Sequence, residues 1–139
     1  MDAEKYLLQI RKLNHMIHNK MTELEQLRSM TGSKAITYDS EHVQTSRNLE
    51  GFAKYIPSIV TLDNEINQAV DEFVTKKNEI IKMIEQVQSP DVYDVLYMYY
   101  VQEMKWTEIS VEKNFTYQWI HELKRKGIEE VQSIIDRSL

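Results

Sequence analysis

The strongest constraint on the fold of this chain is a run of apolar residues that recur with alternating steps of three and four. Only Lys76 interrupts the run. Such spacing places the apolar side chains on one face of a helix, as in a coiled coil, and the stem of Lys76 can lie along that face. The helix is expected either to begin near Asn48 and bend at Pro57, or to have Pro57 in its first turn. The run consists of Ile59, Leu62, Ile66, Ala69, Phe73, Lys76, Ile80, Met83 and Val87.

A second run of the same kind lies nearer the N-terminus, between residue 3 and about residue 30, with one gap at Lys20. Gly32 is the first glycine, and it marks a C-terminal stop. We predict one helix of about 28 residues, roughly 42 Å long, which pairs with the next helix as a long antiparallel hairpin of the coiled-coil type. Its seam comprises Tyr6, Ile10, Leu13, Ile17, Leu24 and Leu27, and Met16, Met21 and Met30 are expected to broaden this face.

The segment between the two helices, residues 32–48, loses this periodicity and is rich in short polar side chains. We predict a connecting loop there, and loops of this length are either mobile or functional. A second apolar stripe, formed by Val70, Val74, Ile81 and Ile84, lies beside the 59–87 seam. Because a two-helix hairpin cannot bury both stripes, the second is expected to pack on the C-terminal domain or on another subunit, which makes a homodimer the expected assembly.

A domain boundary is predicted at Ser89-Pro90-Asp91, where Ser caps a new helix, Pro takes its first position and Asp lies near the positive end of the dipole. The predicted domains are therefore residues 1–88 and residues 89–139. A helix over residues 90–103 follows. Its inward residues are predicted to be Val92, Val95, Leu96 and Tyr99, with Tyr93, Tyr97 and Tyr100 at the margins.

The stretch from Trp106 to Lys126 has the pattern of a helix-turn-helix. Its apolar anchors are Ile109, Phe115, Ile120 and Leu123, and Ser110 is a small residue where two helices must approach closely. Asn114 stands where the turn requires a left-handed residue. Thr116 is predicted to cap a helix that runs to about Arg137, and Gly127 is expected to weaken that helix in its middle.

A helix-turn-helix presents its second helix to the major groove of DNA. In that interpretation Thr116, Tyr117, Gln118 and His121 contact base edges, with Gln suited to adenine. The phosphates are expected to be held by Lys105, Lys124, Arg125 and Lys126. The same spacing also suits a plain three-helix bundle that packs against a protein partner.

Charge and composition limit the classes of function. Residues 105–139 carry six basic and six acidic side chains, whereas residues 1–104 carry 11 basic against 16 acidic ones. The electrostatic attraction to DNA is therefore expected to be weak per subunit. The absence of cysteine rules out disulfides and thiolate metal sites and fits a reducing cytoplasm. The N-terminus does not resemble a signal peptide, and no window approaches the roughly 18 apolar residues of a membrane span.

No constellation for catalysis is evident in the sequence. It contains no Ser-His-Asp set, Gly-rich phosphate loop or paired-carboxylate pocket. His15 and His18 lie three residues apart, but with no third ligand nearby they are predicted to be solvated surface residues rather than a metal pair. We therefore expect no enzyme, no metal and no cofactor.

Residues 95–131, VLYMYYVQEMKWTEISVEKNFTYQWIHELKRKGIEEV, resemble the region-four helix-turn-helix of bacterial sigma factors. The N-terminal EKYLLQIRKL helix and the EHVQTS loop complete a layout similar to small proteins encoded by phages and prophages of Gram-positive bacteria, relatives of the ArpU and RinA types of late transcription regulator. The matching residues are Leu96, Tyr99, Tyr100, Trp106, Glu108, Ile109, Ile120, Leu123 and Arg125.

The resemblance implies binding to a phage late promoter in the bacterial host cell, activation of late genes, and contact with host RNA polymerase. The chain departs from the family pattern at four positions. Lys113 and Gly127 replace apolar or alanine residues and are expected to loosen the module, whereas Ser110 and Asn114 are mild changes. The alternative function is a protein-interaction module that holds RNA polymerase or another regulator without touching DNA.

Overall fold

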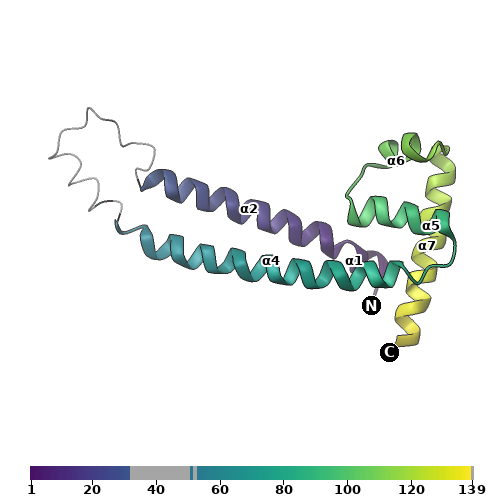
Figure 1. The fold of residues 1–139 in the computed structure, drawn as a ribbon, viewed down its shortest axis with the longest axis horizontal. Coiled ribbons are helices and arrows are strands. Elements are labelled where there is room, and N and C mark those ends of the chain that lie inside the picture. Colours follow the sequence, from purple (N-terminus) through teal and green to yellow (C-terminus); the bar gives the residue numbers. More distant parts are fainter. Residues whose placement is uncertain (32–50, 52, 139) are drawn as a thin grey trace. The chain divides into compact units, whose positions relative to one another are not determined.

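The computed structural model describes residues 1–31, 51 and 53–138, and every element within them is helical (Figure 1). The predicted all-α fold is confirmed, whereas the predicted loop over 32–48, the Gly32 stop and a helix start at Asn48 lie outside the described residues. The elements are α1 (Ala3–Leu7), α2 (Gln9–Met30), α4 (Ile56–Ile84), α5 (Pro90–Leu96), a π-helical turn η1 (Tyr97–Val101), α6 (Trp106–Lys113) and α7 (Tyr117–Ser138).

The chain forms two compact units. Unit 1 comprises Met1–Asn14 and Glu72–Leu139, and unit 2 comprises His15–Asp71. This division differs from the predicted boundary at Ser89, because residues on both sides of Ser89 share one core. The physical reason is the second apolar stripe of α4. Its C-terminal members, Ile81 and Ile84, require cover, and Ile84 is fully buried in the unit 1 core.

The core of unit 1 draws on every helix that contributes residues to the unit. The chain's N-terminal segment takes part, because Leu7 and Ile10 are completely buried with the helices that follow Ser89. Gln132 on α7 accepts a hydrogen bond from the Ala3 N–H at 2.8 Å and donates one to the Met1 carbonyl at 2.8 Å. The largest fully buried side chains are those of Leu7, Ile10, Ile80, Ile84, Val95, Leu96, Tyr100, Ile109, Ile120 and Val131.

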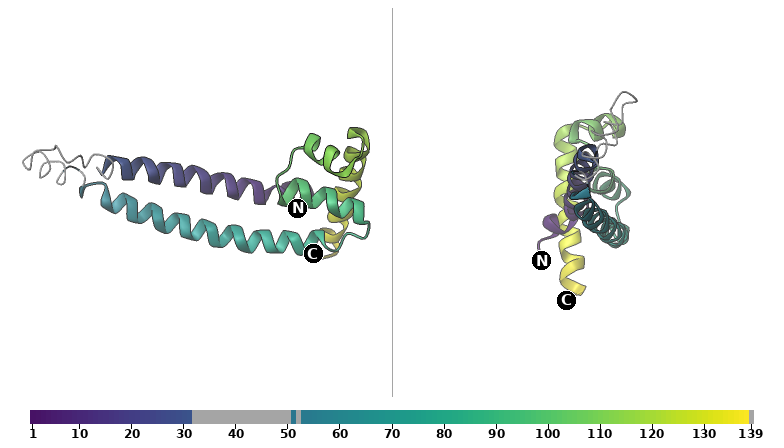
Figure 2. Two further views of the ribbon diagram at one scale, coloured as in Figure 1. Left: turned by 45° about the horizontal axis from the view of Figure 1, so that its top comes forward. Right: turned by 90° about the vertical axis from the view of Figure 1, so that its left-hand side faces the viewer.

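Unit 2 is an antiparallel pair of helical segments from α2 and α4, which run side by side in both figures (Figures 1 and 2). Its buried apolar side chains among the described residues are Ile17, Leu24 and Leu62. Two ion pairs, Lys20–Glu65 at 3.1 Å and Arg28–Asp63 at 3.4 Å, link the two segments. The gap that Lys20 leaves in the heptad seam is thus filled by a charged pair.

The apolar seam of α2 is narrower than predicted. Leu13 and Leu27 are half-buried, but Met16, Met21 and Met30 are 42%, 52% and 49% exposed. The expectation that the methionines broaden the buried face is therefore wrong. Within unit 2 each helix has one partner helix, and one partner covers only a narrow stripe. The predicted single helix is also interrupted at Leu8, where α1 ends and α2 begins.

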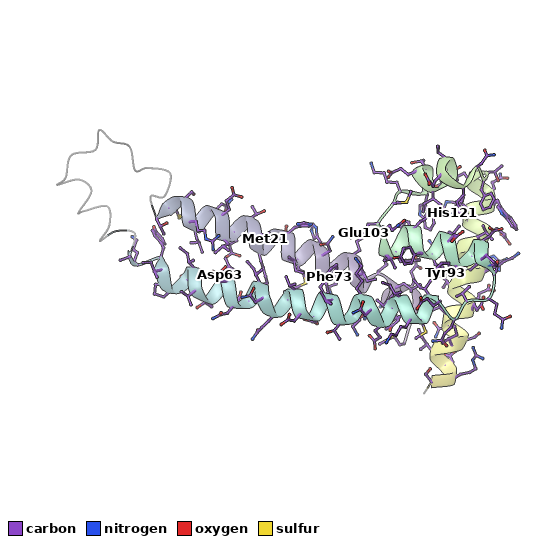
Figure 3. The ribbon with its side chains drawn as sticks, in the orientation of Figure 1. Met21, Asp63, Phe73, Tyr93, Glu103 and His121 are labelled. Carbon is purple, nitrogen blue, oxygen red and sulfur yellow. The ribbon has the colours of Figure 1, made fainter. Side chains whose placement is uncertain are left out.

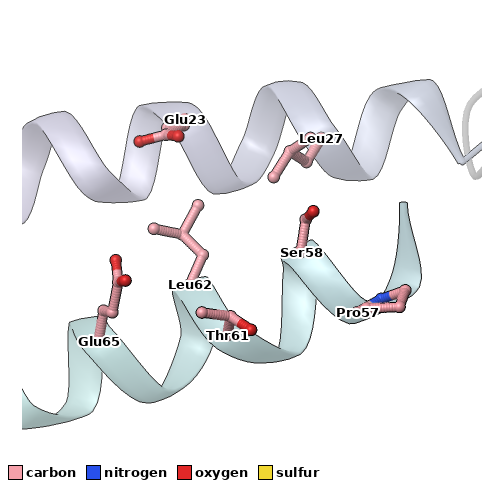
Figure 4. A pocket seen from close by; sticks show the side chains of 7 residues that line it. All are labelled: Glu23, Leu27, Pro57, Ser58, Thr61, Leu62 and Glu65. Atoms are coloured by element: carbon pink, nitrogen blue, oxygen red, sulfur yellow. The ribbon is translucent and has the colours of Figure 1, made fainter. Parts of the chain in front are cut away.

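On α4 the helix begins at Ile56, so Pro57 lies in its first turn. A depression of about 300 Å³ lies between the two helices of unit 2 close to this start. Figure 4 shows Glu23 and Leu27 on one side of it and Ser58 and Leu62 on the other. Its remaining lining residues are Pro57, Thr61 and Glu65, and the Glu65 carboxylate already pairs with Lys20.

The segment after Ser89 begins as predicted and then departs from the α-helical period. The Ser89 hydroxyl accepts a hydrogen bond from the Val92 N–H at 3.4 Å, and Pro90 takes the first turn. At η1 the Gln102 N–H donates to the Tyr97 carbonyl, five residues back. This wider turn rotates the following side chains, so Tyr100 is buried and Tyr99 is half-buried, the reverse of the prediction.

Candidate nucleic-acid interface

The turn between α6 and α7 has the geometry that the sequence predicts. Asn114 adopts the left-handed conformation, with φ 56° and ψ 42°. The Ser110 hydroxyl donates to the Phe115 carbonyl at 2.5 Å, and the Thr116 hydroxyl accepts from the Trp119 N–H at 3.1 Å. These contacts close the turn and cap α7, so the first turn of α7 is held in a defined position.

Three of the four predicted anchors of this module, Ile109, Ile120 and Leu123, are buried, and Phe115 is half-buried against the same core. Lys113, expected to loosen the module, forms an ion pair with Asp94 at 2.6 Å. That pair joins α6 to α5 at the surface of unit 1. The charge of Lys113 therefore has a partner on the neighbouring helix, and the expected loosening of the module stays a prediction.

Gly127 also has a packing role. A Cβ atom at this position would stand 2.8–2.9 Å from three side-chain atoms of Leu96, which is fully buried on α5. Helices α5 and α7 therefore approach closely where α7 lacks a side chain. The helical pattern alone did not reveal this close packing, and the expected weakening of α7 by glycine stays a prediction.

The outward face of α7 is a ridge of four side chains spaced by four, three and four residues: Gln118, Glu122, Arg125 and Glu129. Arg125 bonds to Glu129 at 2.8 Å through one terminal nitrogen and to Glu122 through the other. The hydrogen bond and charge of Arg125 lower the pKa of Glu122, and the same contact raises the pKa of Arg125. The guanidinium predicted to hold a phosphate is thus engaged by two carboxylates.

One flank of this ridge is an aromatic stack. Tyr99 and Trp106 lie parallel with ring centroids 3.7 Å apart. His121 lies on α7 (Figure 3). Its ring centroid is 5.2 Å from that of Trp106 and 4.3 Å from that of Tyr117. His121 is therefore half-buried between two rings, whereas Tyr117 remains 51% exposed.

Lys124 belongs to the same flank. Its ammonium lies 5.2 Å from the Trp106 ring centroid and 3.4 Å from the Glu4 carboxylate. Its side chain is only 24% exposed. Lys124 was predicted to contact phosphate, but in unit 1 it instead links α7 to the N-terminal helix α1.

The opposite flank holds a residue that sequence reasoning missed. Trp119 is 40% exposed in the first turn of α7, and the Lys126 ammonium lies 5.2 Å from its ring centroid. The helical period does indicate that Trp119 is exposed. Trp119 precedes the buried Ile120 by one residue, so its side chain points about 100° away from that of Ile120. Gln118 and Thr116 are exposed beside Trp119, and Lys105 is exposed at the start of α6.

The segment that leads into α6 is held by the N-terminal region. Glu103 has a positive φ of 57°, and its carboxylate accepts a hydrogen bond from the Asn14 amide at 2.8 Å. Arg11 donates to the Tyr99 carbonyl at 3.0 Å, and its guanidinium lies 4.5 Å from the Tyr99 ring centroid. No sequence pattern predicts these contacts, since about 90 residues separate the partners.

Two expectations concern other sites. His15 and His18 are both exposed, and within the described part of the chain no three His, Cys, Asp or Glu residues gather as a metal site would require. Among the described helices, none combines the length and apolar character needed to cross a bilayer.

Comparison with known protein families identifies a family to which the chain is similar. A family model described as "Protein of unknown function (DUF1492)" matches residues 53–132, which include α4, α5, α6 and most of α7. No curated protein and no solved structure matches the chain. Because the family model covers more than half of the sequence, this chain belongs to the DUF1492 family.

Proposed function

We propose that this protein is a DNA-binding transcription regulator that reads duplex DNA with the first turn of α7. The observation that carries the proposal is the turn at Asn114, which holds α7 so that Thr116, Tyr117 and Gln118 are exposed. Helix-turn-helix proteins contact base edges with this part of their second helix. The sequence resemblance to sigma region four and to the ArpU and RinA types adds the class of target: late genes of a phage, activated in the cytoplasm of a bacterial host.

In this proposal, fewer cations are free to contact phosphate than the sequence suggests. Lys105 and Lys126 are exposed, whereas Lys124 pairs with Glu4 and Arg125 pairs with Glu122 and Glu129. The ionic contribution per subunit is therefore small, and the logarithm of the binding constant should fall with the logarithm of salt concentration at a slope near −2. A dimer that carries two such modules would raise the effective concentration of the second on DNA.

The test is a gel shift with the DNA that flanks the gene, at a fixed and stated salt concentration. Saturable, sequence-selective retardation is expected. Gln118→Ala should weaken binding to the preferred site by about tenfold, since one good side-chain-to-base contact contributes roughly 1–3 kcal/mol. The matched control is Gln86→Ala, an exposed glutamine after α4, which should bind as the parent does. Equal affinities for all three proteins would contradict α7 as the reading helix.

The second candidate function is a protein-interaction module for RNA polymerase or another regulator. The observation that favours it is the combination of neutralised cations on α7 with Val111, which is 83% exposed on α6. An exposed apolar side chain contributes to protein interfaces more than to phosphate contacts. Absence of retardation up to tens of micromolar protein, with retention of purified host RNA polymerase on the immobilised protein, would support this function over DNA binding.

A further inference from the structure

The side chains exposed in the first turn of α7 are of few chemical kinds. Its exposed side chains are the hydroxyl of Thr116, the phenol of Tyr117, the amide of Gln118 and the indole of Trp119. None of these carries a charge. Base recognition by this turn therefore depends on the Gln118 amide and two hydroxyls, which both donate and accept hydrogen bonds, and on two aromatic rings.

Two side chains of α7 that could read guanine, Arg125 and Lys124, are engaged elsewhere, and the exposed Lys105 and Lys126 lie outside the first turn of α7. Guanine presents two acceptors in the major groove, and a bidentate Arg or a Lys is its usual partner. Both terminal nitrogens of Arg125 bond to glutamates, and Lys124 is held between Glu4 and the Trp106 ring. His121, a further donor, is packed between Trp106 and Tyr117.

The remaining side chains match an A·T pair. A glutamine amide can bond to N6 and N7 of adenine together, and apolar surface suits the methyl group of thymine. Gln118 and Trp119 are consecutive, so their side chains leave the helix about 100° apart and address neighbouring base pairs. The Lys126 ammonium, 5.2 Å from the Trp119 ring centroid, carries the positive charge that an adjacent phosphate requires.

We propose that the first turn of α7 selects A·T-containing steps, with the Gln118 amide on adenine and the Trp119 ring against the methyl group of a neighbouring thymine. This inference rests on the proposed DNA-binding function and adds the class of base pair that is read. It also assigns a specificity role to Trp119.

The test begins with the full-length protein and a pool of random DNA duplexes, from which the bound fraction is selected and sequenced. An A·T-rich core is expected. In that core, thymine is then replaced by deoxyuridine, which lacks the methyl group, or adenine by 7-deaza-adenine, which lacks N7. The first change should weaken binding by about fourfold per contacted methyl, and the second by about tenfold or more.

The variants separate the two contacts. Trp119→Ala should lose its sensitivity to deoxyuridine and keep its sensitivity to 7-deaza-adenine, and Gln118→Ala should show the reverse. Trp119→Phe, which keeps an aromatic surface, should retain part of the deoxyuridine effect. Since Trp119 and Gln118 are exposed, unchanged thermal melting of each variant is the control for folding.

The outcomes distinguish this inference from the proposed function. Selection of a G·C core, or a deoxyuridine effect that persists in full in Trp119→Ala, overturns the A·T assignment and leaves DNA binding intact. Failure to retain any duplex from the pool overturns the proposed function, and the inference falls with it. An A·T core with the paired loss of sensitivities supports both.

Discussion

Helices α2 and α4 extend through both units, but their apolar faces are covered differently in each. On α4 the seam residue Ile80 in unit 1 is fully buried, whereas in unit 2 Leu62 is buried but Ile59 and Ile66 are only half-buried. In unit 1 further helices cover the α4 seam, and in unit 2 the seam has a single helical partner. A heptad pattern thus predicts which side faces inward, but the number of surrounding helices decides how much free energy burial contributes.

The difference has a consequence for function. The proposed reading turn belongs to unit 1, the better packed of the two, and rigid elements position recognition side chains more accurately than loosely packed ones. Unit 2 has few buried side chains and several exposed apolar ones, including Ile56, Val60 and Val70. Units with few buried contacts open locally at lower free energy than the whole chain.

The largest effect should come from matched Leu→Ala substitutions in the two units. Leu7→Ala removes a fully buried side chain from unit 1 and should lower the free energy of unfolding by about 3 kcal/mol or more. Leu24→Ala in unit 2, where the side chain is 7% exposed on a thinner core, should cost about 1.5 kcal/mol. Urea unfolding followed by circular dichroism, with amide hydrogen exchange to locate the loss, checks this. Equal losses would contradict the contrast between the units.

Gly127→Ala should destabilise unit 1 by about 1 kcal/mol. Overpacking costs roughly 1–3 kcal/mol, and alanine recovers about 1 kcal/mol of helix propensity. In a Leu96→Ala background the clash is removed, so the same change should become neutral or stabilising. Ser133→Ala, at an exposed position of α7 where the hydroxyl bonds to the Glu129 carbonyl one turn back, is the control for a change to alanine away from Leu96. A stabilising Gly127→Ala in the parent chain would show that Leu96 adjusts freely.

An ion pair of unit 1 should also stabilise the fold more than an ion pair of unit 2, although the difference in free energy is smaller. A double-mutant cycle on Lys113–Asp94, which is 2.6 Å long in unit 1, should give a coupling of about 1 kcal/mol. The Lys20–Glu65 pair of unit 2, at 3.1 Å with a more exposed carboxylate, should give about 0.3 kcal/mol. Thermal unfolding at low and at 1 M salt measures both couplings. A larger coupling for Lys20–Glu65 would reverse the ranking of the two units.

The smallest expected change in stability at neutral pH comes from the phenol of Tyr6 in unit 1. Burial, with the nearby Glu79, raises the pKa of the Tyr6 phenol to about 12. The folded state therefore favours the neutral phenol. Its stabilising contribution is fully present below about pH 10, the ordinary pKa, and is lost as the pH rises toward 12. The difference in melting temperature between the parent and Tyr6→Phe should shrink from pH 8 to pH 11. A constant difference would show that Tyr6 ionises normally.

Much of the local structure was predictable because it depends on neighbours in sequence. The cap at Ser89, the bounds of α6, the left-handed Asn114 and the cap at Thr116 all follow from residue type and spacing over a few positions. The direction of the buried faces of α2 and α7 follows from the helical period in the same way, but the width of the α2 face does not. DNA binding, the dimer and the phage origin stay predictions.

Other features depended on contacts between distant segments. The π turn at Tyr97–Val101 exchanges the roles of Tyr99 and Tyr100, and no local signal marks it. The division of α4 between two units likewise depends on where residues 1–14 pack.

The sequence by itself determined an all-helical chain with a helix-turn-helix whose turn is built from Ser110, Asn114 and Thr116, because these are short-range effects of hydrogen bonding and backbone preference. Only the tertiary structure decided which side chains of α7 remain available for contact with another molecule. It engages Lys124 with Glu4, surrounds His121 with rings and leaves Trp119 exposed. Availability depends on what lies opposite each side chain in space, and a helical period specifies direction but not the partner found there.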